Sequence, residues 1–82
     1  MSLESLRAQL DEVDAALIET LARRAELVEE IWAWKTANSV ARVDSKREDE
    51  VRARLLAQAD SLGLKREAVS AILDRIIRVA LR

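Results

Sequence analysis

Apolar side chains recur along the first part of the chain in alternating steps of four and three residues, the spacing that keeps them on one face of a helix. The pattern predicts one long helix from about Leu3 to Thr36. Its apolar face, which we call the seam, consists of Leu6, Leu10, Val13, Leu17, Thr20, Arg24, Leu27, Ile31 and Trp34. Arg24 stands where a packed helix would carry Leu or Val, and Lys35 ends the same face, so the seam includes two cations that need an explanation.

Two further helices are expected after a loop. The stretch "TANSVARV" interrupts the apolar spacing, and the "DSKRE" that follows carries two helix-start signals. Asp44 or Ser45 can cap the helix, and Ser45 with Glu48 fits an S-x-x-E capping box. Gly63 predicts the end of this second helix, and a third helix is expected from about Lys65 to the end of the chain. The apolar positions of the second helix are Val51, Leu55, Leu56, Ala59 and Leu62. The third helix is expected to bury Val69, Ile72, Leu73, Ile76, Ile77, Ala80 and Leu81.

The first helix is too long for a domain of 82 residues. At about 1.5 Å per residue it extends roughly 50 Å, whereas a compact domain of this size is about 30 Å across. Leu and Val side chains on the projecting part would be exposed and would favour aggregation. We therefore expect an all-α fold with three helices per chain, in which the long first helices of two copies pack antiparallel in a homodimer. The alternative is a monomer whose first helix turns back near "TLARR", where no Gly or Pro marks a turn.

The composition fits a single helical domain over residues 1–82 and excludes several classes of protein. Half of the residues are hydrophobic, and 14 Lys and Arg face 15 Asp and Glu, for a net charge of −1. A near-neutral chain argues against nucleic-acid binding. No apolar run approaches the roughly 18 residues of a membrane span, and the N-terminus lacks the layout of a signal peptide. Since the absence of cysteine is compatible with a reducing compartment, we expect a cytoplasmic protein.

The missing residue types also limit the chemistry. The chain has no His and no Cys, so it lacks the commonest general base, the commonest metal ligand and the thiol nucleophile. It also has no glycine-rich loop that could bind a phosphate group. We therefore expect no cofactor and no metal, and an enzyme with this sequence would act through positioned charges.

Arg24 and Lys35 are candidates for such charges. They are eleven residues apart, so they lie about 20° apart around the helix and about 16 Å apart along it. Their side chains could close on a small organic anion, which would offset the cost of burying two cations. Asp44, Arg47 and Glu48 follow the loop directly and can fold back over the Lys35 end of the helix.

Arg7 lies about 25 Å from Arg24 along the helix axis, so it can join the same site only from an antiparallel partner. The cations also have plainer explanations. Arg24 can pair with a glutamate across a dimer and set its register, and Lys35 can extend into water from the helix end. The glutamates near Arg24 are Glu26, Glu29 and Glu30. The case for a binding site therefore rests on the combination of these residues and its order along the chain.

This combination resembles the all-helical chorismate mutase family over essentially the whole chain. The segments that carry the resemblance are "LRAQLDEVDAALIETLARRAELVEEI", "DSKRE" and "GL". Lys35, eleven residues after Arg24, also matches the family pattern. The matching positions are Leu6, Arg7, Asp11, Asp14, Arg24, Lys35, Asp44, Arg47 and Glu48. The resemblance implies an intertwined dimer with two shared sites. It also implies an isomerase that rearranges chorismate to prephenate in the shikimate pathway, for Phe and Tyr biosynthesis.

The resemblance further implies a role for each residue. Arg24 and Arg7 of the partner subunit would pair with the two carboxylates of chorismate, and Lys35 would donate a hydrogen bond to the ether oxygen as its C–O bond breaks. Glu48 would receive the ring hydroxyl, with Arg47 holding Glu48 in place. The implied catalytic residues are Lys35, Arg24 and Glu48, the other substrate-binding residues are Arg7, Asp44 and Arg47, and the apolar walls are Ile31, Ile77 and Ala80.

The chain departs from the family near its end. Fully active members often carry Gln or Glu one turn beyond the Ala80 region, opposite the lysine, whereas this sequence ends at Arg82, which could itself replace that group. We therefore expect low intrinsic activity. Some short members are activated by docking onto a heptulosonate-phosphate synthase, which is a candidate partner. Trp32 and Trp34 replace small residues, and we expect Trp34 to pack in the seam and Trp32 to shape the pocket mouth or a partner surface.

Three other functions stay open. An isochorismate-pyruvate lyase would share the cations but typically lacks the D-x-x-R-E motif. An aminodeoxychorismate mutase would present an amine that Glu48 could also receive. A non-catalytic helical binding protein fits the missing Gln-type donor, but the presence of Arg24, Lys35, Arg47 and Glu48 argues against it.

Overall fold

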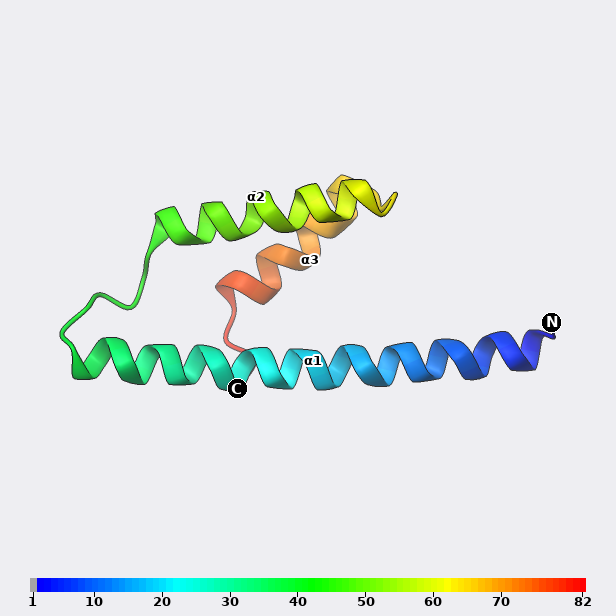
Figure 1. Cartoon of the computed structure of the whole chain (residues 1–82), viewed down its shortest axis with the longest axis horizontal. Helices are drawn as coiled ribbons and strands as arrows, with labels where there is room; N and C mark the ends of the chain where they lie inside the picture. Colours follow the sequence, from blue (N-terminus) through cyan, green and yellow to red (C-terminus); the bar gives the residue numbers. More distant parts are fainter. Residues whose placement is uncertain (1) are drawn as a thin grey trace.

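The computed structural model describes residues 2–82 and consists of three α-helices, α1 (Leu3–Ala37), α2 (Ser45–Ser61) and α3 (Arg66–Arg78) (Figure 1). No strand occurs within these residues. The prediction of an all-α fold with three helices and a long first helix is confirmed. None of the three helices combines the length and the apolar character needed to cross a lipid bilayer.

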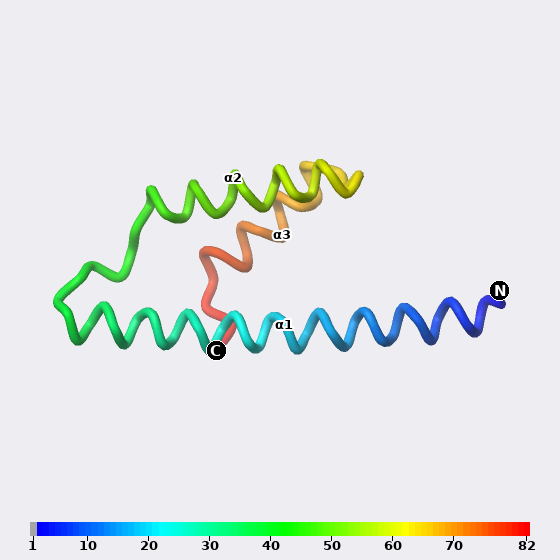
Figure 2. Tube along the Cα trace, in the orientation of Figure 1, coloured from blue at the N-terminus to red at the C-terminus, as the bar shows by residue number. Residues whose placement is uncertain are grey.

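Helix α1 runs unbroken along the whole molecule, and its N-terminal part projects beyond α2 and α3 (Figure 2). The Ser2 side chain caps it by accepting a hydrogen bond from the Ser5 N–H at 3.0 Å. The molecule measures 55 × 23 × 16 Å, and its radius of gyration of 16.1 Å exceeds the roughly 12 Å of a compact domain of this size. The alternative of a turn near "TLARR" is therefore wrong, because α1 has no break there.

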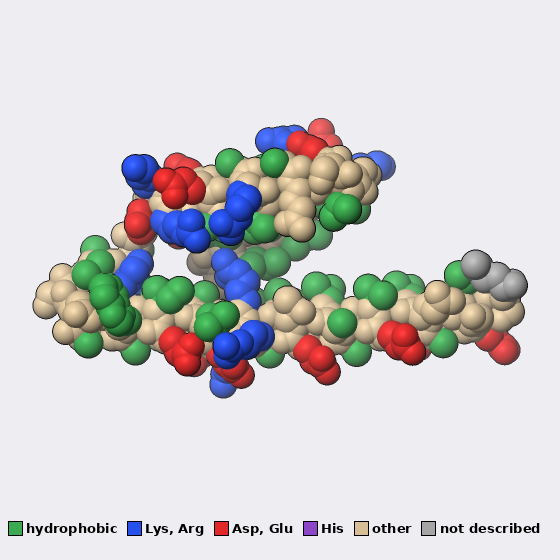
Figure 3. All heavy atoms as spheres, in the orientation of Figure 1, with side chains coloured by type: hydrophobic (Ala, Val, Ile, Leu, Met, Phe, Trp, Pro, Cys, Tyr) green, Lys and Arg blue, Asp and Glu red, His purple; other side chains and the backbone are tan. Residues whose placement is uncertain are grey.

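A single chain buries little of its apolar surface. The buried hydrophobic residues among those described are Ala25, Leu56, Ala59 and Leu73. Helices α2 and α3 pack on each other, and the Arg52–Asp74 ion pair joins them at 2.5 Å. The apolar seam side chains stay between 40% and 63% exposed, and they are Leu6, Leu10, Val13, Leu17, Leu27, Ile31 and Trp34. Figure 3 shows hydrophobic side chains in a row along the part of α1 that projects beyond α2. The seam is thus left without a covering element in one chain.

Both ends of α2 follow local signals in the sequence. Asp44 is the N-cap, and its Oδ1 accepts a hydrogen bond from the Arg47 N–H at 3.1 Å. Of the two capping residues left open by the sequence, the structure selects Asp44, and Ser45 becomes the first helical residue. At the other end Gly63 has a φ of +74°, and the Leu64 and Gly63 N–H groups donate to the Ala59 and Asp60 carbonyls. This is the Schellman arrangement expected of a C-terminal glycine.

The end of α3 differs from the prediction. The helix was expected to continue to the end of the chain, but it stops at Arg78, and Val79 is extended with φ −109° and ψ 129°. The Ile76 carbonyl, which would accept the Ala80 N–H in a continuing helix, instead accepts a hydrogen bond from Arg24 Nη1 at 3.1 Å. A side chain on α1 thus takes the place of the next turn of α3, and Leu81 is 48% exposed rather than buried.

Helix α1 also ends in a Schellman arrangement, but with a serine in the left-handed position. Ser39 has a φ of +56°, and the Val40 and Ser39 N–H groups donate to the Lys35 and Thr36 carbonyls. A side chain at a positive φ is strained because its Cβ crowds the backbone. From this turn the chain leaves the end of α1 and runs to the start of α2 (Figure 1).

The two left-handed positions predict opposite effects on stability. Gly63→Ala introduces a Cβ at a positive φ and should lower the free energy of unfolding by about 1 kcal/mol, although nothing lies within 4 Å of the new atom. Ser39→Gly relieves the same strain and should raise it by about 0.5 kcal/mol. Urea unfolding at one fixed protein concentration measures both. Equal or reversed effects would contradict the assignment of these turns.

Candidate active site

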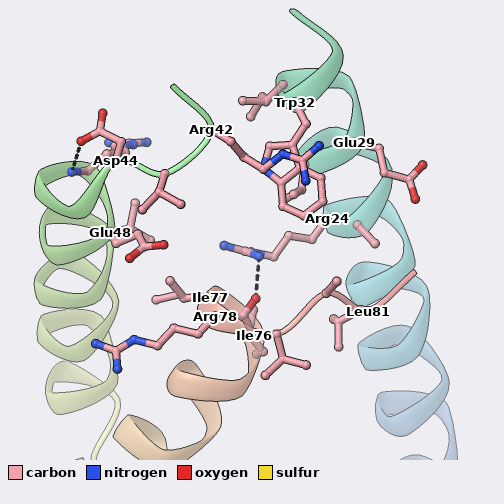
Figure 4. Close-up of a pocket in the computed structure, with 18 of the residues that line it drawn as sticks. Arg24, Glu29, Trp32, Arg42, Asp44, Glu48, Ile76, Ile77, Arg78 and Leu81 are labelled. Carbon is pink, nitrogen blue, oxygen red and sulfur yellow. Dashed lines mark hydrogen bonds between the residues drawn. The ribbon is translucent and has the colours of Figure 1, made fainter. Parts of the chain in front are cut away.

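A cavity of about 410 Å³ lies between α1, the segment that joins α1 to α2, the start of α2, and the end of α3 with the residues after it. Its volume falls in the range of ordinary small-molecule sites, about 300–1,000 Å³. Figure 4 shows side chains from these elements pointing into one space. The predicted apolar walls all contribute to the lining, and they are Ile31, Ile77 and Ala80.

Cations outnumber acids around this cavity. The lining cations are Arg24, Lys35, Arg42, Arg47, Arg78 and Arg82, and the lining acids are Glu29, Asp44 and Glu48. The whole chain has a net charge of −1, so the cavity has a local excess of positive charge that the chain as a whole lacks. A concave site with an excess of positive charge attracts small anions.

Arg24 is half-buried and reaches across the cavity from α1. Its Nη1 donates to the Ile76 carbonyl at 3.1 Å, which ties the guanidinium to α3 and leaves further N–H groups for a ligand. Within the chain, Glu26 pairs with Arg23 at 3.1 Å. Its other carboxylate oxygen lies 3.8 Å from Arg82. Arg24 therefore keeps its charge directed into the cavity.

Lys35 lines the same cavity from the last turn of α1. It is half-buried, and its Nζ donates to the Arg42 carbonyl at 3.0 Å. The plainer explanation, a lysine extending freely into water, does not describe this conformation. An ammonium group has three N–H donors, so two remain for a ligand.

The start of α2 supplies the acids. Glu48 is half-buried and faces the cavity in the first turn, whereas one carboxylate oxygen of Asp44 is used as the helix cap. Arg47 lies 4.0 Å from Glu50 and is 59% exposed. The expectation that Arg47 holds Glu48 is thus not met in this chain, because the ion pair of Arg47 runs along α2, three residues onward.

Arg7 lies in the exposed N-terminal part of α1 and is not among the lining residues. It is 17 residues from Arg24 on an unbroken helix, or about 25 Å along the axis. The prediction that it cannot reach the site within one chain agrees with this placement. Whether a second chain brings it there stays a prediction.

Sequence reasoning missed Arg42, Arg78 and Glu29 as lining residues. The Arg42 guanidinium carbon lies 4.4 Å from the centroid of the Trp32 ring, so a loop arginine stacks on a half-buried indole. The expectation that Trp32 lies at the pocket is supported, since it belongs to the lining. A loop residue has no periodicity to place it, and only the chemical match between arginine and tryptophan could have suggested this contact.

Arg82 lines the cavity, as expected if it compensates for a missing group there, but its side chain is engaged elsewhere. Its Nε lies 3.6 Å from Glu29 and its Nη1 lies 3.8 Å from Glu26. These contacts hold the residues after α3 against α1. Trp34, expected to pack in the seam, is 60% exposed in the single chain.

A cation-rich cavity in an all-helical chain is suited to holding a small anion. Comparison with known proteins identifies the class more closely, since residues 6–82 match the family described as chorismate mutase type II. A T-protein from Enterobacter agglomerans is 34% identical over 76 residues, which cover 93% of this chain and 20% of the T-protein. No solved structure gives a significant match. The chain belongs to the chorismate mutase type II family, a family of isomerases, and it spans about a fifth of that curated relative.

Asp44 caps α2 and also lines the cavity. Its contribution to the stability of the fold can be tested separately from any role in binding. Asp44→Ala removes the N-cap and should lower the free energy of unfolding by about 1 kcal/mol. Asp44→Asn keeps an oxygen that can accept the Arg47 N–H and should stay close to the original stability. Thermal unfolding followed by circular dichroism compares the two. If both variants lost the same free energy of unfolding, the hydrogen bond of the cap would not explain how Asp44 stabilises the fold.

Proposed function

We propose that this protein is a chorismate mutase that rearranges chorismate to prephenate by positioned charge. The observation that carries the proposal is the convergence of Arg24, Lys35 and Glu48 on one cavity of about 410 Å³. Family membership over residues 6–82 supports the same reaction. The rearrangement is intramolecular and needs no proton transfer and no covalent intermediate, which suits a chain without His or Cys.

The substrate is a dianion, and its two carboxylates complement the positive charge of the cavity. Arg24 binds one carboxylate, since its guanidinium matches carboxylate geometry and is already directed inward by its bond to Ile76. Holding both carboxylates brings the enolpyruvyl arm over the ring, a conformation that is sparsely populated in solution.

Lys35 stabilises the charge that develops during the reaction. As the ether C–O bond breaks, negative charge grows on the oxygen, and a prepositioned ammonium group stabilises it more in the transition state than in the ground state. Glu48 receives the ring hydroxyl on the α2 side of the cavity. Asp44 and Arg47 complete that side, Asp44 through its remaining carboxylate oxygen and Arg47 through its charge.

The second carboxylate is bound by Arg7 of the partner subunit in an intertwined antiparallel homodimer. Two observations support this assembly. The seam of a single chain is 40–63% exposed at its Leu, Val, Ile and Trp positions, which is more apolar surface than a soluble monomer keeps uncovered along one helix. The unbroken α1 also holds Arg7 about 25 Å along the axis from Arg24, so Arg7 can reach a cavity of this kind only from a second chain.

The two sister activities, on isochorismate and on aminodeoxychorismate, can be distinguished from the proposed one by the substrate that the protein consumes. An amine in place of the ring hydroxyl could also donate to Glu48, and isochorismate carries the same two carboxylates. Incubating the protein separately with chorismate, isochorismate and aminodeoxychorismate, and following the loss of each, distinguishes the reactions. Prephenate formed from chorismate supports the proposal, and turnover of another substrate alone would assign a sister activity to the same site.

Replacing the proposed donor should remove catalysis without removing the fold. Lys35→Ala is expected to lower kcat by about 10²–10³-fold, the usual effect of losing one preorganised donor. Its circular dichroism and sedimentation should match those of the parent protein. Lys46→Ala, on the exposed first turn of α2 and outside the cavity, is the matched control and should keep its activity. A Lys35→Ala variant with full kcat would remove Lys35 from the mechanism.

A site formed by residues of two subunits predicts that two inactive variants can restore activity when mixed, which a site within one chain does not predict. Arg7→Ala and Lys35→Ala should each be nearly inactive alone, yet a mixture that exchanges subunits should regain about a quarter of the parent activity, because each mixed dimer contains one intact site. The two variants are mixed, denatured and refolded together, and the mutase activity of the mixture is then measured. No recovery, with mixed dimers shown by mass spectrometry, would place Arg7 outside the partner's site while leaving the chorismate reaction itself untouched.

A further inference from the structure

One loop residue contacts two neighbouring turns of α1 at the edge of the cavity. The side chain of Arg42 stacks on Trp32 at 4.4 Å from the ring centroid, and its carbonyl accepts a hydrogen bond from Lys35 Nζ at 3.0 Å. Trp32 and Lys35 are three residues apart on α1, so they share a face of the helix. Figure 4 shows Arg42 reaching from the loop towards Trp32 at the cavity.

The loop has little else to hold it in this position. Its two valines, Val40 and Val43, are 45% and 71% exposed, so no buried apolar side chain anchors it. It leaves α1 through the strained turn at Ser39, with a φ of +56°. The middle of the loop is thus attached to α1 through Arg42, by the stack of its side chain on Trp32 and by the bond of its carbonyl to Lys35.

The carbonyl on this loop restricts a flexible side chain. A lysine ammonium ends four rotatable bonds and loses much conformational freedom when held in one place. The bond to the Arg42 carbonyl selects one position of Lys35 Nζ at the cavity and uses one of its three donors. A donor that is already positioned costs less reorganisation during the reaction.

We propose that Arg42 is a positioning residue: its stack on Trp32 fixes the loop so that its carbonyl holds the Lys35 ammonium in place at the cavity. The catalytic consequence rests on the proposed function, whereas the effect on Lys35 itself does not. A different role for Arg42 is that its charge attracts the dianion directly. The two roles separate because replacing Trp32 removes the stack and leaves the charge of Arg42 in place.

The first experiment needs no substrate. The chain has three lysines, Lys35, Lys46 and Lys65, and the rate at which each is acetylated by a small reagent can be followed by mass spectrometry. Trp32→Leu should raise the rate at Lys35 about two- to fivefold relative to the exposed Lys46 and Lys65, the range expected for losing one cation–π contact. Trp32→Phe keeps an aromatic ring and should largely restore the parent rate. An unchanged ratio in Trp32→Leu would overturn the proposal.

The second experiment compares kinetic constants. Trp32→Leu and Arg42→Gln should each lower kcat about two- to fivefold, and the double variant should fall no further than the lower single variant, because both substitutions release the same contact. Arg54→Gln, which removes an exposed arginine of α2 outside the cavity, controls for the lost charge and should leave kcat unchanged. A change confined to KM in Arg42→Gln, with normal kinetics in Trp32→Leu, would show that Arg42 acts by charge alone and overturn its positioning role.

The two experiments separate this proposal from the proposed function. A protein that turned over none of the three candidate substrates would contradict the proposed function, while the acetylation ratio would still test the hold on Lys35. A protein that converts chorismate but shows multiplicative losses in the double variant would keep its function and lose the positioning role of Arg42.

Discussion

The hydrogen bond from Arg24 to the Ile76 carbonyl is the contact on which the site depends. It joins residues 52 positions apart, whereas the other side-chain contacts of α1 within the described chain are mostly local. The bond is made to the carbonyl that another turn of α3 would use, at the point where α3 stops at Arg78 and the residues after it turn towards α1. It also fixes the direction of a guanidinium that would otherwise be a costly cation on an apolar helix face. This one bond therefore joins the end of α3 to α1 beside the cavity and directs a charge into it.

Helix α1 carries both the cations of the site and the apolar seam, which no other element covers in a single chain. Four residues of the described chain form its buried hydrophobic core, too few to account for a stable domain by burial alone. The seam supplies the missing apolar surface if a second α1 packs against it, and Arg7 then moves from an isolated position to the neighbourhood of a cavity. Stability and catalysis would in that case depend on one interface, since the apolar seam and the cations Arg7, Arg24 and Lys35 lie on the same helix.

Local signals account for most of the helix ends, and long-range contacts account for the differences. The boundaries of α1 and the glycine turn at Gly63 follow from side chains within a few residues of each end, which is why the sequence predicted them. The sequence also placed the cap of α2 at Asp44 or Ser45, and the structure selects Asp44. The end of α3 instead lies beside a long-range contact, the bond from Arg24 of α1 to the Ile76 carbonyl. No local signal marks that position, and the prediction of a helix to the end of the chain was wrong there.

For the candidate site, the spacing of Arg24, Lys35 and Glu48 was readable from the sequence, because helical periodicity and a short loop place these residues on facing elements. Their convergence on one cavity agrees with that reading. The stack of Arg42 on Trp32 and the tie of Arg82 to Glu26 and Glu29 were not readable, because loop residues and chain ends have no repeat that assigns them a face. The sequence by itself determined which helices form and which charges they carry, since both depend on neighbours within a turn. Only the tertiary structure decided which donors and acceptors those charges meet, since these lie on segments whose approach depends on the packing of the whole chain.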